Sequence, residues 1–101
     1  MSVKITQNGE VVTAYLEGEI DHHSAGELRR EIDEAVERDC PTMLVLDFKD
    51  VTFMDSSGIG LIMGRSKLMK ECGGRLEVRN SQPYIKRVLK LSGIERIVKI
   101  T

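Results

Sequence analysis

One nearly continuous apolar run in the middle of the chain constrains the fold most. Met43 to Leu46 places four apolar side chains in succession, inside a segment that extends from Thr42 to Phe48. An unbroken run of this kind is typical of a central strand covered on both faces, as in a parallel sheet. Parallel strands need crossover connections, which are usually helices. We therefore expect helices on either side of this run.

Three segments carry helical patterns. The first has apolar residues at helical spacing from Ala25 to Val36, with Ser24 and Glu27 spaced as a capping box, and we expect it to end at Cys40-Pro41. The second begins near Asp55-Ser56-Ser57 and ends at Cys72-Gly73-Gly74, and the third opens at Ser81-Gln82-Pro83 and ends at Gly93. The expected inner face of the second helix comprises Ile59, Ile62, Met63, Ser66 and Met69.

The remaining segments read as strands. Asn8-Gly9 predicts the turn of an N-terminal hairpin, whose second strand should end at Gly18 and the stretch Glu19-Ile20-Asp21. Lys49-Asp50 reads as a turn, and further strands are expected at Arg75 to Arg79 and at Ile97 to Ile100. The order β-β-α-β-α-β-α-β predicts an α/β fold of one domain over residues 1–101. Its sheet should be mixed but mostly parallel, with the hairpin as the antiparallel pair.

Composition excludes several functions. The net charge is −1 and the chain has two Tyr, two Phe and no Trp, so neither a basic face nor a stacking platform for nucleic acid is indicated. No apolar run is long enough to cross a membrane, and no signal peptide opens the chain. The two cysteines, Cys40 and Cys72, have no zinc or redox spacing. These features predict a cytoplasmic protein without metal or cofactor.

The segment from Phe53 to Gly60 departs from the plain pattern. It lies where a strand passes into a helix, and such a helix start exposes unpaired N–H groups and the positive end of the helix dipole. A phosphoserine there would find hydrogen-bond donors for its oxygens. Asp, Ser and Gly are also common helix caps, and both interpretations can hold together. Gly58 and Gly60 would allow close approach by a partner, and no lysine follows them as a phosphate loop requires.

A second polar segment precedes the first helix. Asp21, His22 and His23 superficially suggest a metal site, but adjacent histidines on a strand would point to opposite faces. Loops that follow parallel strands gather at one edge of the sheet. The topology therefore predicts that this segment and Ser56 share one rim, as parts of one partner-binding surface.

Together, these two segments resemble the signature stretches of the anti-sigma factor antagonists of the STAS-domain family. They are Gly18 to His23 and Phe53 to Gly60, and further likeness extends over nearly the whole chain. Members of that family, when unphosphorylated, bind an anti-sigma factor and release the sigma factor. The family usually has another helix after the last strand, and we expect this chain to lack it. The Asp-His-His stretch favours sporulation over the general stress response.

The resemblance implies roles for particular residues. Ser56 would be phosphorylated by the anti-sigma factor, an ATP-dependent serine kinase, and restored by a metal-dependent serine phosphatase. The chain would be a monomer when free, and not an enzyme. The expected partner-binding residues are Asp21, His22, His23, Asp55, Ser56, Ser57, Gly58, Ile59 and Gly60.

Two other classes of function remain open from the residues. One is a nucleotide- or small-ligand-binding module that uses the anion site at the helix start, which would bind nucleotide without a protein partner. The other is a hydrolase using Ser56 with His22 or His23, although no orienting residue or oxyanion pattern is evident.

Overall fold

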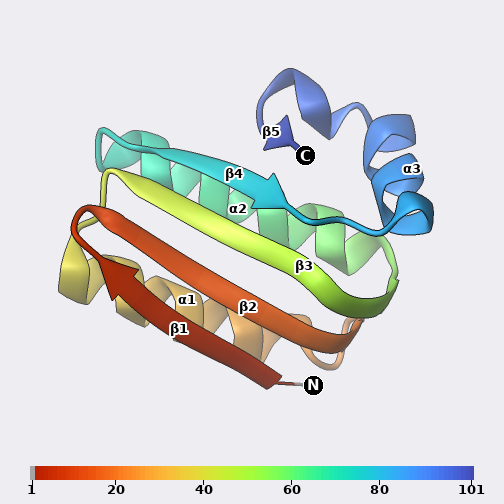
Figure 1. Cartoon of the computed structure of the whole chain (residues 1–101), viewed down its shortest axis with the longest axis horizontal. Helices are drawn as coiled ribbons and strands as arrows, with labels where there is room; N and C mark the ends of the chain where they lie inside the picture. Colours follow the sequence, from red (N-terminus) through yellow and green to blue (C-terminus); the bar gives the residue numbers. More distant parts are fainter. Residues whose placement is uncertain (1) are drawn as a thin grey trace.

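The computed structural model describes residues 2–101. A five-stranded sheet is flanked by α-helices, and the chain runs through them in the predicted order, with one short 3₁₀ helix added (Figure 1). The strands are β1 (Ser2–Asn8), β2 (Val11–Ile20), β3 (Met43–Met54), β4 (Arg75–Arg79) and β5 (Lys99–Ile100). The helices are α1 (Ala25–Asp39), α2 (Ser56–Glu71), α3 (Pro83–Ser92) and the 3₁₀ helix η1 (Ile94–Arg96).

The strands lie in the spatial order β1-β2-β3-β4-β5, so each pairs with its neighbours in sequence. β1 and β2 form an antiparallel hairpin, and all the other pairs are parallel. The predicted mixed, mostly parallel sheet is confirmed. Helices α1 and α2 lie against the same face of the sheet, and α3 lies at the end where β4 finishes (Figure 1).

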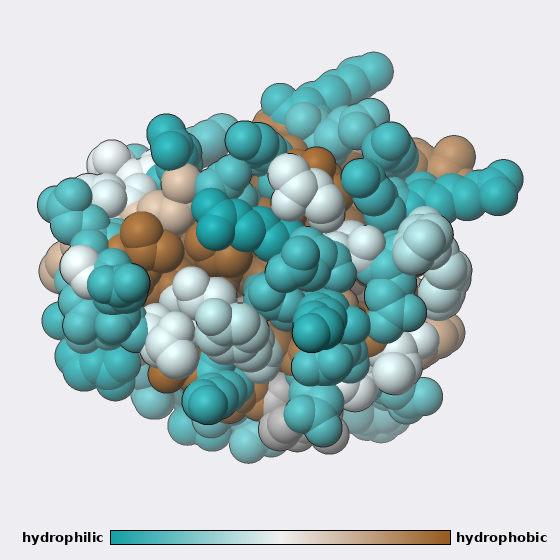
Figure 2. Space-filling view, viewed as in Figure 1, coloured by the Kyte–Doolittle hydropathy of each residue, from teal (hydrophilic) through white to brown (hydrophobic). Residues whose placement is uncertain are grey.

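The core lies between the sheet and these two helices. Side chains from alternate positions of β2 and β3 meet apolar residues of α1 and α2, and Phe48 is completely buried there. The expectation of cover on both faces is wrong, because no helix among residues 2–101 lies over the other face (Figure 1). Val45 is nevertheless only 1% exposed, in register between Thr13 and Glu77. Side chains of neighbouring strands therefore supply the second cover, and this face is largely hydrophilic (Figure 2).

Several element boundaries differ from those predicted. Lys49 and Asp50 are not a turn but part of β3, which continues to Met54. β2 passes through Gly18, at a φ of 96°, and ends at Ile20, within the predicted stretch. The hairpin turn is Gly9-Glu10, since Asn8 already pairs with Val11. Where a strand was expected from Ile97, β5 has only two residues, because the N–H groups of Ile97 and Val98 both donate to the carbonyl of Ile94 in η1.

One residue of α2 also differs from expectation. Met63, expected on the inner face of α2, is 50% exposed, whereas Met54 and Met69 are buried. Cys40 and Cys72 are free and exposed thiols. No helix in the described part of the chain has the length and apolar character needed to cross a membrane.

Candidate functional site

Ser56 is the first residue of α2 and its side chain is exposed. Asp55 is the N-cap, in an extended conformation, and its carboxylate Oδ1 accepts a hydrogen bond of 2.7 Å from the N–H of Ser57. Asp55 therefore caps α2, as expected of a polar residue at this helix start. Gly58 donates its N–H to the carbonyl of Asp55 at 3.0 Å.

The N–H group of Ser56 has no acceptor within the described residues. The unpaired N–H groups of a first turn, together with the helix dipole, favour negative charge at this position. The hydroxyl of Ser56 thus combines exposure with an electropositive helix start. This combination can hold a phosphoryl group without unfolding the helix.

A tight turn around Asp21 connects β2 to α1. The carboxylate Oδ1 of Asp21 accepts hydrogen bonds from the N–H groups of His23 at 2.9 Å and Ser24 at 3.0 Å. The predicted capping box is wrong: Ser24 has helical backbone angles and its side chain makes no capping hydrogen bond. Its hydroxyl instead donates to the carbonyl of Glu19, so Ser24 stabilises the turn rather than the helix end.

The hydrogen bonds of this turn should depend on pH. The N–H of Ser24, aided by that of His23 and opposed by burial, lowers the pKa of Asp21 below its ordinary value of about 3.9. A lowered folded-state pKa stabilises the turn above the unfolded-state pKa, and this contribution is lost as pH falls through the folded value. We expect the amide shifts of His23 and Ser24 to titrate with a midpoint below 3.9 in an NMR series. A midpoint at or above that value would contradict this arrangement.

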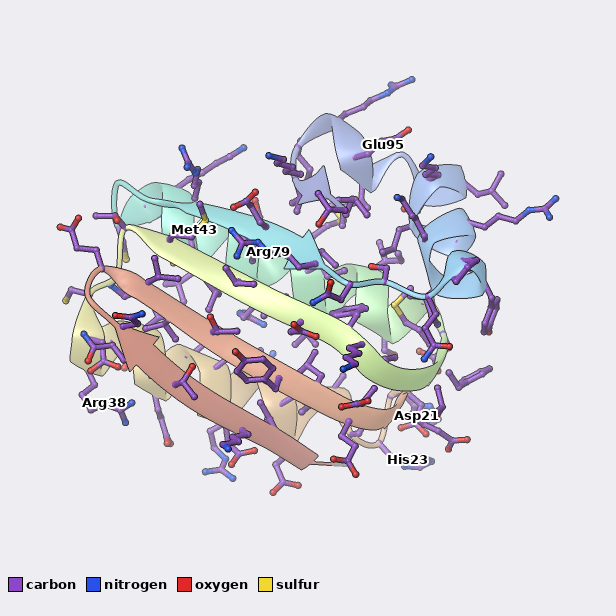
Figure 3. All side chains as sticks on the ribbon, viewed as in Figure 1. Asp21, His23, Arg38, Met43, Arg79 and Glu95 are labelled. Carbon is purple, nitrogen blue, oxygen red and sulfur yellow. The ribbon has the colours of Figure 1, made fainter. Side chains whose placement is uncertain are left out.

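His22 and His23 lie in this exposed turn and not on a strand. Their ring centroids are 4.0 Å apart, so they do not point to opposite faces, as adjacent residues of a strand would. Within residues 2–101, no group of three or more metal-binding side chains forms. The two rings are tilted by 38° to each other, and His23 lies close to Asp21 (Figure 3).

The two candidate segments share one rim of the sheet, as the topology predicted. Ile20 pairs with Met54, and the N–H of Asp55 donates to the carbonyl of Ile20 at 3.1 Å. These contacts bring the end of β2 next to the end of β3, immediately before Asp21 and Ser56. We call this surface, made of Asp21, His22, His23, Asp55 and Ser56, the switch rim.

The neighbouring glycines differ in position. Gly60 is exposed, but Gly58 is buried, and a Cβ atom added at Gly58 would overlap the side chain of Met54. Gly58 thus lets α2 pack closely on the end of β3. Its lack of a side chain serves this internal packing rather than the approach of a partner. Ile59 is half-buried.

Sequence reasoning missed an exposed apolar extension of the switch rim. Met63 follows Ser56 by seven residues, and positions at this spacing lie on one helix face. Gly60 lies between them on that face. Phe53, just before the cap, is 42% exposed. The sequence contained a signal for the exposure of Phe53, because Phe53 and Met54 are adjacent on one strand and cannot both point inward.

A groove between α1 and α2 begins beside the switch rim. Its volume is about 290 Å³, and the residues lining it include Gly26, Arg29, Ser57, Gly60 and Arg65. Small residues form much of its lining, and two arginines contribute positive charge. Arg65 is 8% exposed and contacts Asp33 of α1, with 2.7 Å between Nε and Oδ1.

Comparisons with known proteins identify the family to which this fold belongs. A family model for the STAS domain matches residues 2–101, so the chain belongs to the STAS-domain family. Within the family, it is 37% identical over 100 residues to the "Anti-sigma F factor antagonist" of Paenibacillus polymyxa, which covers 99% of this chain and 86% of that protein. It is 32% identical to the "Anti-sigma-B factor antagonist" of Bacillus subtilis, covering 100% of this chain and 91% of that protein.

Solved structures of one relative show the same fold in two states. The anti-sigma factor antagonist SpoIIAA in its unphosphorylated form is 30% identical, with a TM-score of 0.84 over 99% of this chain and 88% of that one. SpoIIAA from Bacillus in the phosphorylated form has a TM-score of 0.76 at 30% identity, over 99% and 91%.

Proposed function

We propose that this chain is an anti-sigma factor antagonist whose unphosphorylated form binds an anti-sigma factor and thereby releases a sigma factor. The observation that carries this proposal is the exposed hydroxyl of Ser56 at an N–H group without an acceptor among residues 2–101. The named antagonists that the chain resembles support it. The likeness to SpoIIAA, solved with and without phosphate, supports phosphorylation as the switch.

The anti-sigma factor would phosphorylate Ser56, and the phosphorylated chain would then release it. A kinase active site supplies the nucleotide, the magnesium and the catalytic base, so this chain needs to present only the hydroxyl. It is a substrate and regulator rather than an enzyme. A metal-dependent serine phosphatase would restore the free hydroxyl, and the chain would act as a monomer in the cytoplasm. Its two exposed free thiols suit a reducing compartment. Sporulation is the pathway favoured by the Asp-His-His stretch.

The remaining exposed side chains of the switch rim would form the binding surface. Asp21, His22 and His23 flank the phosphorylatable hydroxyl on one side, and Met63 extends the apolar part along α2. Well-packed apolar contacts at the centre of an interface and polar ones at its edge are the usual arrangement. Ser57, Ile59 and Gly60 would contact the partner beside Ser56, whereas Gly58 would act through the packing of α2.

Replacing Ser56 by Ala should abolish labelling. Ser57 is half-buried, and its N–H donates to the capping carboxylate of Asp55. We therefore expect the kinase to modify only the exposed Ser56. The purified chain would be mixed with the anti-sigma factor encoded in the same genome and with ATP, then resolved by phosphate-affinity electrophoresis.

The matched control is Ser57→Ala, which should be labelled like the parent chain. Labelling of Ser56→Ala at a normal rate would show that the modified residue lies elsewhere. No labelling of the parent chain under conditions in which the kinase is active would oppose the proposed function itself.

The groove between α1 and α2 favours a second candidate, a module that binds a small anion or nucleotide. Arg29, Arg65 and Ser57 converge on it beside the start of α2. Calorimetric titration of the chain alone with ATP and GTP separates the two candidates. Tight binding that Arg29→Ala removes would favour this second function, whereas the first requires no nucleotide affinity in this chain.

A further inference from the structure

Helix α3 presents an unpaired positive face. Its ten residues include Lys86, Arg87 and Lys90 and no acid, although the whole chain has a net charge of −1. Within the described residues, none of these three side chains forms an ion pair. Five other cationic residues do: Arg30, Arg38, Arg65, Arg79 and Lys99. Lys86 and Lys90 also stand at a spacing where like charges destabilise a helix.

Apolar side chains lie beside this charge. The core-facing residues Ile85 and Leu89 are buried, but Leu91 is 80% exposed and Tyr84 is 52% exposed. Pro83, Arg87 and Leu91 recur at four-residue spacing and form one ridge, and Lys86 and Lys90 form a second. A groove of about 410 Å³ is lined by these same five residues.

Such ridges are the elements by which helices pack together. When four-residue ridges of two helices interdigitate, the helices cross at about −50°. Here the outer face of α3 has the ridges but no partner helix among residues 2–101 (Figure 1). Long side chains with nitrogen at their ends project from it into solvent (Figure 3).

The start of α3 is fixed to the same rim as Ser56. The side-chain amide of Gln82 donates to the carbonyls of Lys49 at 3.0 Å and Val51 at 3.3 Å, both in β3. β3 then continues to Met54 and passes into Ser56 through the cap. A partner that covers the switch rim can therefore reach α3 along the edge of the sheet.

We propose that the outer face of α3 docks an acidic amphipathic helix of the protein partner. The groove receives that helix's apolar ridge, Leu91 and Tyr84 pack against it, and Asp or Glu side chains pair with Lys86, Arg87 and Lys90. The identity of the partner as the anti-sigma factor rests on the proposed function. Charge pairing of this kind accelerates encounter and fixes the docking register.

An anionic lipid surface fits this helix less well. A helix that lies in a membrane interface buries a broad apolar face between flanking cations. In α3 that face is already occupied, because Ile85 and Leu89 are packed in the protein core. Two exposed apolar side chains remain, which is enough to complete a protein interface but little for insertion into lipid.

The test compares two double variants with the same change of charge. Arg87→Glu with Lys90→Glu alters two exposed residues of α3. Lys70→Glu with Arg75→Glu alters two exposed residues at the opposite edge of the sheet and is the control. Binding to the anti-sigma factor encoded in the same genome is measured by calorimetry at low and high salt, and circular dichroism verifies folding of each variant.

We expect the α3 variant to bind at least about tenfold more weakly and to lose most of the salt dependence. The control should stay within about twofold of the parent, because exposed charges away from an interface contribute little. Leu91→Ala should weaken binding several-fold with its salt dependence unchanged. That second variant separates apolar docking from general electrostatic attraction.

Equal affinities of the α3 variant and its control would overturn the inference and leave the proposed function standing. Failure of the parent chain to bind the anti-sigma factor would instead reject the proposed function, and the docking inference with it. Sedimentation with vesicles of phosphatidylserine and phosphatidylcholine is the last arm. Binding of the parent chain that the α3 variant loses would assign this face to lipid and overturn the protein partner.

Discussion

Replacing Ser56 by Asp should weaken binding to the anti-sigma factor about 100-fold while leaving the fold intact. A factor of 100 in affinity corresponds to about 3 kcal/mol. Like-charge contact and the desolvation of one carboxylate at an interface are enough to supply that amount. No large conformational change is required, because the hydroxyl of Ser56 already faces solvent.

The same substitution should not destabilise the chain. Asp is favoured in the first turn of a helix, where it interacts with the dipole and with unpaired N–H groups. The N–H of Ser56 lacks an acceptor within the part of the chain described, and the cap at Asp55 does not depend on the side chain of Ser56. We therefore expect a thermal midpoint equal to or above that of the parent. This separates a switch at an interface from a general loss of structure.

The measurement is a binding titration accompanied by thermal denaturation. Ser56→Ala is the matched control, and it should bind about as tightly as the parent because it adds no charge. Tight binding by Ser56→Asp would contradict a charge-based switch. Weak binding by both variants would instead indicate that the hydroxyl itself is a contact.

The layout of the sheet could be predicted from sequence because it depends on local patterns. The apolar run at β3, the helical periods on either side of it and the glycines that end the helices each report on their own segment. Handedness and the gathering of loops at one edge then brought Asp21 and Ser56 to the same rim. The cap at Asp55 followed from the same local chemistry.

The errors arose where the path of the chain in space, rather than residue spacing, decides which groups meet. Ser24 has the spacing of a cap, but its N–H donates to the carboxylate of Asp21 and its hydroxyl donates to the carbonyl of Glu19. These hydrogen bonds replace those of a capping box. Gly58 suggested room for a partner, yet Met54, from the preceding strand, occupies that space. These partners are near in sequence, but spacing alone does not show which of them the folded backbone brings together.

Helix α2 was the hardest to orient. Buried Arg65 and Ser66 stand among its inward positions, while the apolar Met63 points outward. Polar residues inside and an apolar residue outside weaken any periodic signal. Arg65 lines the groove between α1 and α2, and Met63 lies next to the switch rim. Periodicity alone therefore could not orient this helix.

The two residues of the ion pair between Arg65 and Asp33 should contribute unequally to stability. The Nε and Oδ1 atoms approach at 2.7 Å without the angle of a hydrogen bond, so the contact is chiefly coulombic. Burial raises the pKa of Asp33 and lowers that of Arg65, and each charge opposes the effect of burial on the other. Arg29 lies near enough to attract Asp33 and to repel Arg65.

Asp33→Asn should therefore cost the most stability. It leaves the buried guanidinium of Arg65 beside Arg29 without a compensating charge, and we expect a loss of about 3 kcal/mol in the free energy of unfolding. In a domain of this size that corresponds to a fall of roughly 10–20 °C in the melting temperature. Arg65→Met should cost less, about 1–2 kcal/mol, because the remaining Asp33 is partly exposed and keeps Arg29 nearby.

The double variant Asp33→Leu with Arg65→Met tests whether the pair itself stabilises the fold. Replacing both buried charges by apolar side chains removes the desolvation penalty together with the attraction, so its stability should lie within about 1 kcal/mol of the parent. Urea denaturation of the parent, the two single variants and the double variant ranks their free energies of unfolding. A double variant less stable than Asp33→Asn, or a loss from Arg65→Met that exceeds the loss from Asp33→Asn, would show that packing rather than charge governs this contact between α1 and α2.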